Sequence, residues 1–343
     1  MASFDSQKIN VGIIGSGFAA YTHMLAFKHI PLAQVYAIAG GTRAASLSQL
    51  AGCKHLSTVE ELLQLSELDA VIICSPHFLH ESHTLQAFQQ AKHVLVEKPM
   101  ATDVQACQRM IASSVKAQRV LMVGHFQRYR LTNAAAKMAI ADGRLGRVFF
   151  IQDTLFEQPS TKPWEQDARA RGFLLGYGIH AIDRILWWQE GRKVRSVYGI
   201  SQNPDNRSVE CISSVILEFD DQSVASITTS NYGGLPRANS PGAAFFQATV
   251  IGSSGALSVD AYGKVLLRSS PGQETETLAE LPQWSSLDAL ERLQAYIHQD
   301  KEFIDAICGK GLPSIDGWAG MRNVQVALAA YEASLTRQVV RLE

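Results

Sequence analysis

The chain has 343 residues, of which 46% are hydrophobic and 18% are charged, and its formal net charge is −1. This length can bury two cores of ordinary size, so we expect two domains. The near-zero net charge creates no field that would attract nucleic acid or an anionic membrane surface, and neither partner is expected. Because no run approaches about 18 uninterrupted apolar residues, no membrane-spanning helix is predicted.

The first twelve residues are polar where a secretory signal needs an apolar segment, so we expect no signal peptide. The cysteines are odd in number, scattered and without a CxxC pair, which is typical of reduced thiols. They are Cys53, Cys74, Cys107, Cys211 and Cys308. We therefore expect a cytoplasmic protein.

Residues 9–125 alternate short apolar runs with amphipathic segments. Runs this apolar suit the strands of a parallel sheet that is covered on both faces. The five expected strands are Ile9–Ile14, Gln34–Ala39, Ala70–Cys74, His93–Glu97 and Val120–Gly124. Strand and helix patterns that alternate at this spacing predict a doubly wound α/β domain over residues 1–125.

Two helix starts are marked by capping residues within this region. Thr102 and Gln105 have the spacing of a capping box, which predicts a helix that continues to about Ala117. Ser57 or Thr58 is expected to cap the preceding acidic segment.

After residue 125 the pattern changes to longer strands with tight turns, which predicts an α+β domain over residues 126–343. Its helices are expected at Ala134–Asp142, Gly178–Trp188, Leu287–Cys308 and Gly317–Ser334. Its strands are expected at Arg147–Asp153 and Val194–Ser201, and in the hairpins Glu210–Phe219 with Ser223–Ser230 and Phe245–Gly252 with Ala256–Ala261. The sheet is expected to be mainly antiparallel.

A glycine-rich turn, GSGFAA, follows the first expected strand. Gly15 permits a tight turn, and Gly17 allows a pyrophosphate to approach the backbone at the start of the helix that Phe18 opens. Ala20 is small enough for that helix to pack against the strand. The turn predicts dinucleotide binding, the alternative being a plain strand–turn–helix connection.

The end of the second expected strand bears on which dinucleotide is bound. An NAD site usually has a carboxylate there for the ribose 2′-hydroxyl, but no acidic residue occurs between Asp5 and Glu60. Thr42 and Arg43 stand there instead, and a hydroxyl with a guanidinium suits a 2′-phosphate. We predict NADP(H), with NAD(H) as the alternative; Arg43 could also be a solvated residue at a helix start.

Further polar residues follow the third and fourth expected strands. Because parallel strands place their carboxyl ends at one edge, these residues are expected to line one cofactor crevice. They are Ser75, His77 and His80, and then Glu97 and Lys98. A metal site formed by His77, His80 and His83 is not expected, because neither a zinc motif nor a nearby cysteine accompanies them.

Lys98 is the first candidate catalytic residue. The following Pro99 restricts Lys98 to extended geometry, so its side chain is held. An ammonium at this place can donate to a substrate oxygen and favour its anionic character. The alternative is a surface lysine that ends a strand.

His180 and Asp183 are the other candidates. They are three residues apart on an expected helix, so they share a face, and the apolar sequence around them predicts that both are at least partly buried. A partly buried histidine beside a carboxylate is a natural proton acceptor. The alternative is a hydrogen-bonded histidine near a helix start.

These motifs, in this order and spacing, resemble the Gfo/Idh/MocA family nearly from end to end. The similar segments are Gly15–Ala20, Glu97–Pro99, Phe126–Tyr129, Gly178–Asp183, Leu312–Gly317 and Tyr331–Ser334. The resemblance implies an N-terminal Rossmann domain, a C-terminal substrate-binding and oligomerisation domain, and hydride exchange between NAD(P) and a sugar, cyclitol or related molecule. It also implies a homodimer or homotetramer formed through the C-terminal sheet.

By the same resemblance, Lys98 is the active-site lysine, its peptide bond to Pro99 is cis, and His180 is the catalytic acid or base. Many family members carry an aspartate four residues before that histidine, where this chain has Gly176; Asp183 is then a candidate to orient His180. Arg128, Trp164 and Arg169 are candidate substrate contacts together with Lys98 and His180, since they lie in loops or near the sheet face.

Two other functions stay open. One is a cofactor-binding regulator of the same fold, to which the absent aspartate gives some weight. The other is a lyase or glycosidase that oxidises its substrate transiently and regenerates a bound cofactor. The sequence does not name the substrate, because specificity depends on the geometry of a few pocket side chains.

Overall fold

The computed structural model of the protein describes residues 8–159, 162–203, 208–232, 244–269 and 274–342. The chain forms two compact units. The first contains the residues up to Phe126 together with Leu293–Arg322, and the second contains Gln127–Arg292 and the residues from Asn323. Residues 293–322, which the sequence grouped with the second domain, therefore lie in the first unit.

The first unit contains a six-stranded parallel sheet with the strand order β3-β2-β1-β4-β5-β6. The strands are β1 (Ile9–Ile14), β2 (Ala33–Ala39), β3 (Lys54–Leu56), β4 (Ala70–Ile73), β5 (His93–Glu97) and β6 (Leu121–Gly124). The order reverses at β1 and β4, so the doubly wound sheet is confirmed. Only β3 was not predicted among the described strands of this sheet, because its sequence KHL is short and polar.

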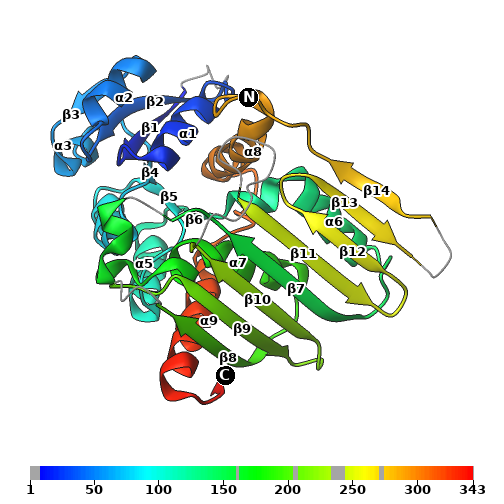
Figure 1. Ribbon diagram of the computed structural model, residues 1–343. Coiled ribbons are helices and arrows are strands. Elements are labelled where there is room, and N and C mark those ends of the chain that lie inside the picture. The colour runs from blue at the N-terminus through cyan, green and yellow to red at the C-terminus, as the bar shows by residue number, and fades with distance from the viewer. Residues whose placement is uncertain (1–7, 160–161, 204–207, 233–243, 270–273, 343) are drawn as a thin grey trace. The chain divides into compact units, whose positions relative to one another are not determined.

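Helices connect these parallel strands, as a doubly wound sheet requires (Figure 1). They are α1 (Phe18–Phe27), α2 (Ala44–Ala51), α3 (Val59–Leu63), α4 (His80–Gln89) and α5 (Val104–Ala117). Thr58 caps α3 in a complete capping box with Glu61, as the sequence indicated. The predicted cap of α5 was wrong by one residue: the Asp103 carboxylate, not Thr102, accepts a hydrogen bond of 2.7 Å from the Ala106 N–H.

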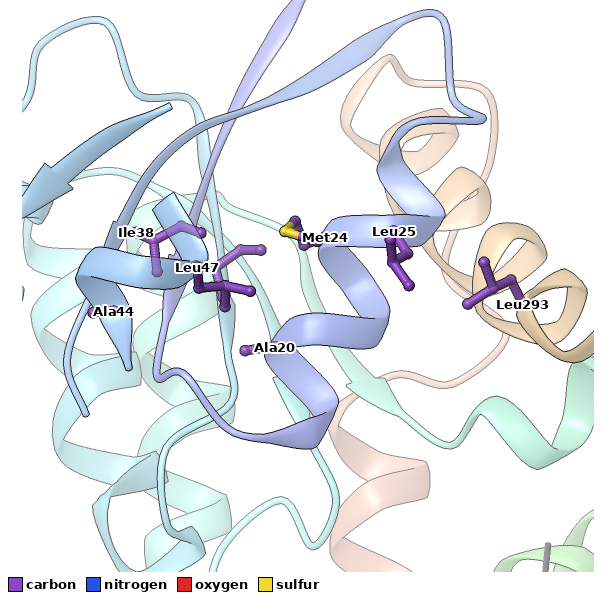
Figure 2. Close-up of a cluster of buried hydrophobic side chains, with 8 residues drawn as sticks. Ala20, Met24, Leu25, Ile38, Ala44, Leu47 and Leu293 are labelled. Carbon is purple, nitrogen blue, oxygen red and sulfur yellow. The ribbon is translucent and has the colours of Figure 1, made fainter. Parts of the chain in front are cut away.

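A buried apolar cluster joins α1 to both neighbouring layers of the first unit. Figure 2 shows Ala20, Met24 and Leu25 of α1 beside residues of β2 and α2, with a leucine of α8 (Leu290–Ile307) at the other side. That leucine is Leu293, which is 2% exposed. The helix from the C-terminal part of the chain thus completes the core of the first unit, which periodicity alone could not reveal.

The second unit contains a nine-stranded sheet with the order β14-β13-β12-β11-β7-β10-β9-β8-β15. The strands are β7 (Val148–Phe156), β8 (Val194–Gln202), β9 (Ile212–Phe219), β10 (Val224–Ser230), β11 (Phe245–Gly252), β12 (Ala256–Asp260), β13 (Lys264–Arg268), β14 (Glu276–Glu280) and β15 (Val340–Arg341). Both predicted hairpins are present. Among the described strand pairs of this sheet, β7 with β10 alone is parallel, so the sheet is mainly antiparallel.

Helices cover one face of this sheet (Figure 1). They are α6 (Leu131–Ala141), α7 (Ile179–Trp188) and the second-unit part of α9 (Gly317–Thr336). The strands alternate buried and exposed residues, as expected for a sheet with one covered face. Gly199 of β8 permits a close approach of α9, since a Cβ there would lie 2.6 Å from the Ala330 carbonyl oxygen. No helix in the described part of the chain is long and apolar enough to span a bilayer.

Candidate functional site

The turn between β1 and α1 has the backbone of a phosphate-binding loop. Gly15 has a φ of +113°, and a Cβ there would lie 2.6 Å from the carbonyl oxygen of Cys74. Gly17 precedes the first residue of α1, no described side chain caps it, and a Cβ at this position would meet nothing within 4 Å. The helix N-terminus is therefore open to a ligand, and the Phe18 ring beside it is 41% exposed. These features fit the pyrophosphate of a dinucleotide.

Ala20 supports the same interpretation from inside the protein. Its side chain is completely buried and packs in the cluster that joins α1 to β1 and β2 (Figure 2). A small residue there lets the helix lie close to the sheet, as predicted.

The end of β2 lies against this turn. Gly40 and Gly41 both have a φ of +80°, and a Cβ on Gly41 would collide with the Ser16 hydroxyl. The backbone N–H of Arg43 donates a 3.1 Å hydrogen bond to the same hydroxyl. The side chains of Thr42 and Arg43 are exposed beside the open helix N-terminus. They are thus available to a ribose or a 2′-phosphate.

His80 joins the ends of β4 and β5. Its Nδ1 lies 2.8 Å from the Pro99 carbonyl oxygen, and its Nε2 lies 2.9 Å from the Ser75 carbonyl oxygen. Burial lowers the pKa of His80 to about 4, although its hydrogen bonds to these two carbonyls oppose the shift. The Ser75 hydroxyl lies 3.0 Å from Nδ1 of His83, and the His77 ring is buried edge-on to His80. Their contact with a cofactor stays a prediction.

Lys98 follows the buried end of β5 and is itself half-buried. The Lys98–Pro99 peptide bond is cis, which confirms the expectation from the family resemblance. The backbone N–H of Lys98 donates a 3.1 Å hydrogen bond to Oε2 of Glu97. Glu97 is only 5% exposed, and its carboxylate supports the Lys98 backbone from inside the protein. Its contact with the cofactor stays a prediction.

A buried histidine that the sequence analysis missed lies on the other side of Glu97. The Nε2 of His23 is 3.1 Å from Oε1 of Glu97, and its Nδ1 is 2.8 Å from Oδ2 of Asp300. His23 belongs to α1 and Asp300 to the first-unit part of α8. One signal was available, since a histidine within the apolar helix FAAYTHMLAF needs a polar partner. The partner, 277 residues away, could not be found from local patterns.

In the second unit, α7 carries His180 and Asp183, which are 6% and 1% exposed as their apolar surroundings predicted. The Asp183 carboxylate accepts hydrogen bonds from the guanidinium of Arg128 at 2.6 and 2.9 Å and from the Asn323 amide at 2.7 Å. Arg128, predicted to contact substrate, therefore forms a buried ion pair with Asp183, and this pair fixes one side of α7.

A second buried ion pair fixes α7 through the next residue. The Nε of Arg184 lies 2.8 Å from Oδ2 of Asp153 on β7, and its Nη1 lies 3.1 Å from the Asn133 amide oxygen. Arg184 and Asp153 are 1% and 0% exposed. The sequence analysis did not identify this pair, because a polar residue such as Asp153 is expected on the exposed face of an alternating strand.

A helical turn, Leu174–Gly178, leads into α7 and has its backbone N–H groups bound by side chains. Leu174 N–H donates to Oε1 of Glu210 at 2.5 Å, and Leu175 N–H donates to the Tyr331 hydroxyl at 3.1 Å. The Tyr331 hydroxyl in turn donates to Glu210 at 2.9 Å. Burial raises the pKa of Glu210 to about 7 although these hydrogen bonds oppose the shift. Glu210 and Tyr331 thus fix the segment that contains Gly176.

Trp164 and Arg169, also predicted to contact substrate, lie in two short helical turns of the second unit. Trp164 is half-buried, with the Lys162 ammonium 5.9 Å from its ring centroid. Arg169 is exposed and forms an ion pair of 2.6 Å with Asp167. Their contact with substrate stays a prediction.

The residues predicted for cofactor binding therefore all lie in the first unit, where hydrogen bonds and close contacts connect the ends of β1, β2, β4 and β5. In the second unit, Asp183 contacts Arg128 directly. No cluster of three histidine, cysteine or acidic residues that could hold a metal ion is found among the described residues.

Curated relatives include dehydrogenases and reductases of small hydroxylated molecules. The chain is 30% identical to 1-carboxy-3-chloro-3,4-dihydroxycyclohexa-1,5-diene dehydrogenase from Comamonas testosteroni, over 65% of this chain and 58% of that protein. It is 26% identical to 1,5-anhydro-D-fructose reductase from Ensifer adhaerens, over 84% of each chain. The chain thus spans a little over half of the first relative and most of the second.

Solved structures share the fold over almost the whole chain. Aldose-aldose oxidoreductase from Caulobacter crescentus, complexed with glycerol, has a TM-score of 0.83 and 23% identity, over 98% of this chain and 100% of that chain. Levoglucosan dehydrogenase, complexed with NADH and levoglucosan, has a TM-score of 0.85 and 20% identity, over 98% and 99%.

Two family models match the chain in succession. Residues 9–125 match the NAD-binding Rossmann fold of an oxidoreductase family, and residues 137–342 match the C-terminal alpha/beta domain of the same family. These matches agree with the glycine turn, the strand order and the mainly antiparallel second sheet described above. The chain belongs to the Gfo/Idh/MocA family of oxidoreductases.

Proposed function

We propose that this protein transfers a hydride between NADP(H) and a sugar, cyclitol or related hydroxylated small molecule. The observation that carries the proposal is Lys98, whose backbone is held by a hydrogen bond to Glu97 in the same unit as an open phosphate-binding turn. The names of relatives support the substrate class, since they include inositol 2-dehydrogenase from Rubrobacter xylanophilus at 28% identity over 57% of this chain and 56% of that protein.

The roles of the residues follow from their chemistry. The nicotinamide, when bound, accepts or supplies the hydride. In the direction of oxidation, the Lys98 ammonium donates a hydrogen bond to the substrate oxygen and stabilises its developing negative charge. The imidazole of His180 accepts the proton of the substrate hydroxyl, while the hydride leaves the carbon that bears this hydroxyl. Arg128 holds Asp183 and thereby α7, which carries His180.

The preference for NADP(H) is a separate part of the proposal. The exposed Thr42 and Arg43 lie beside the phosphate-binding turn, and no acidic residue occurs between Asp5 and Glu60. A guanidinium can bind a 2′-phosphate through charge-assisted hydrogen bonds. NAD(H) is the alternative, and it is the cofactor in the levoglucosan dehydrogenase structure.

The test is a panel of sugars, cyclitols and sugar acids, incubated with NADP+ or NAD+ and followed by absorbance of the reduced cofactor. The proposal expects a substrate-dependent increase that is faster with NADP+. Product formed on a tightly bound cofactor without net absorbance change would instead identify transient oxidation. Cofactor binding without turnover of any compound would support a regulator.

We also propose that the protein is a homo-oligomer that buries the open face of the nine-stranded sheet. Strand register places Ile200, Ile216 and Ile251 on the face opposite α6 and α7, and they are 37%, 50% and 43% exposed. Exposed apolar side chains on a sheet face favour association. Light scattering is expected to give a dimer or tetramer that Ile216→Lys weakens; a monomer at micromolar concentration would contradict the proposal.

A further inference from the structure

Three charged side chains form a buried chain inside the first unit. His23 on α1 lies between Glu97 at the end of β5 and Asp300 on α8, with N–O distances of 3.1 and 2.8 Å. The side chains of His23 and Asp300 are inaccessible to solvent, and that of Glu97 is 7% exposed. Three elements that are distant in sequence therefore meet at one imidazole.

Two carboxylates at hydrogen-bond distance from the two ring nitrogens favour a protonated imidazole. A neutral ring has one N–H, so it can donate to one carboxylate and would turn a lone pair toward the other. An imidazolium donates to both. Burial would lower the pKa of His23, but the charge and hydrogen bond of Asp300, together with those of Glu97, raise it to about 10. Burial also raises the pKa of the Asp300 carboxyl, although the charge and the hydrogen bond of His23 oppose this shift.

Two neutral side chains and one cation lie around these three groups. The ring of Tyr296 packs edge-on to His23 at a centroid distance of 5.2 Å. Cys74 is half-buried, and desolvation of its thiol, followed by the charges of Glu97 and Asp300, holds its pKa well above the usual range, so Cys74 is neutral. The cation is Lys98. Burial would raise the pKa of the Glu97 carboxyl, but the hydrogen bond and charge of His23, followed by the charge of Lys98, lower it.

Glu97 connects His23 to the backbone of Lys98. One carboxylate oxygen, Oε1, binds His23, and the other, Oε2, accepts the backbone N–H of Lys98 at 3.1 Å. The orientation of the carboxylate is thus fixed from both sides. Gly124 of β6 leaves room for this carboxylate, since a Cβ at position 124 would lie 3.2 Å from the carboxyl group of Glu97.

We propose that His23 and Asp300 are positioning residues for Lys98: they hold Glu97 ionised and oriented, and Glu97 in turn fixes the Lys98 backbone and stabilises its ammonium. This inference rests on the proposed catalytic role of Lys98. It assigns a function in the reaction to a side chain in the dinucleotide-binding helix and to another from the C-terminal part of the chain.

A purely structural role makes a different prediction. If the three side chains only join α1, β5 and α8, their loss lowers the free energy of unfolding but leaves the native geometry around Lys98 and the turnover of the folded protein unchanged. If they position Lys98, its backbone N–H loses protection and kcat falls, while cofactor affinity and KM change little.

The experiment uses the full-length variants His23→Gln and Asp300→Asn. The matched controls are His93→Gln and Asp69→Asn, which also alter hydrogen-bonded side chains of the first unit, at the opposite ends of the strands. Hydrogen exchange of the Lys98 amide is measured by NMR. We expect exchange to be about tenfold faster in both variants and unchanged in both controls.

A kinetic comparison follows on the substrate that wild-type protein turns over. We expect kcat to fall about tenfold or more in both variants, with KM and the Kd for reduced cofactor within about twofold of wild type. Unchanged amide exchange, or unchanged kcat in the folded variants, would overturn the proposal. If the wild-type protein turns over no substrate, the proposed function fails. Amide exchange still decides whether His23, Glu97 and Asp300 position Lys98.

A third measurement does not depend on the folding of any variant. In wild-type protein labelled with ¹⁵N-histidine, both ring nitrogens of His23 are expected to carry protons at pH 8. A neutral ring at that pH would overturn the proposal.

Discussion

The two units surround their candidate catalytic residues in different ways. In the first unit, charged side chains form a chain that ends at the backbone of Lys98 itself, through Asp300, His23 and Glu97. In the second unit, the charged neighbours of His180 on α7 bind side chains outside that helix. Asp183 pairs with Arg128, and Arg184 pairs with Asp153.

This difference indicates what each network contributes. A network that reaches the reacting residue can alter its orientation and charge, so its loss is expected to appear in turnover. A network that fixes a helix places the reacting residue as part of a rigid element, and its loss is expected to appear first in stability.

The largest loss of turnover from a change in the first unit is expected for Lys98→Met, which removes the ammonium and keeps an unbranched side chain. Turnover is expected to fall about 10²–10³-fold, the range for loss of one donor to a developing oxyanion, with cofactor affinity near wild type. Steady-state kinetics and a cofactor titration measure these quantities. Lys116→Met, at an exposed position of α5, is the control. Near-normal turnover of Lys98→Met would show that Lys98, and with it the network of Asp300, His23 and Glu97, does not contribute to the reaction.

The helix-fixing role is tested by Asp153→Ala, which leaves the Arg184 guanidinium buried without its carboxylate. The free energy of unfolding is expected to fall by about 3–5 kcal/mol in urea titrations. The matched variant is Glu190→Ala, because Glu190 pairs with Lys137 but its side chain is 72% exposed. That variant is expected to stay close to wild type. Equal losses in the two variants would contradict the interpretation.

Glu210 provides a prediction about pH in the second unit. Its pKa is about 7 in the folded protein against an ordinary glutamate value of 4.5, so the folded state binds more protons between these limits. Wild-type stability therefore decreases as the pH rises from 4.5 to about 7, relative to Glu210→Gln, by about 1–3 kcal/mol. Unfolding free energies of both proteins at about pH 4.5 and 7.5 measure the difference. A constant difference across this range would contradict the assignment.

The smallest effect is expected for Arg43, which lies beside the predicted cofactor-binding turn of the first unit. Arg43→Ala is expected to reduce the preference for NADPH over NADH by about tenfold, because it removes a charge-assisted hydrogen bond to the 2′-phosphate. Calorimetric titration with both cofactors measures it, with Lys28→Ala as a control for loss of a surface cation. Equal affinities of wild type for the two cofactors would overturn the NADP(H) proposal.

The fold was largely predictable because its signals are local. The apolar runs from Ile9 to Gly124 and the glycine turn predict a parallel sheet with a dinucleotide site, and turn residues mark both hairpins. The part of the core formed by Leu293 could not be predicted, because an amphipathic helix shows which of its faces is apolar but not which surface covers it.

The candidate site was predictable only where its residues lie in short motifs. Lys98 and His180 are found in short motifs, whereas the side chains that hold them come from distant segments. His23 and Asp300 are 277 residues apart, and Glu210 reaches Leu174 across 36 residues. A single sequence contains the apolar context of a buried histidine or glutamate but not the identity of its partner.

The most direct test of the account is the pH dependence of kcat/KM for oxidation by wild type, His180→Gln and the control His93→Gln. If His180 accepts the hydroxyl proton, the wild-type rate falls as the pH is lowered and the imidazole becomes protonated, and Gly176→Asp moves this limb to higher pH by stabilising the imidazolium. His180→Gln is expected to lose about 10²–10⁴-fold in rate together with the acidic limb, while the control keeps both. A His180→Gln variant with near-normal rate and the wild-type limb would contradict the account.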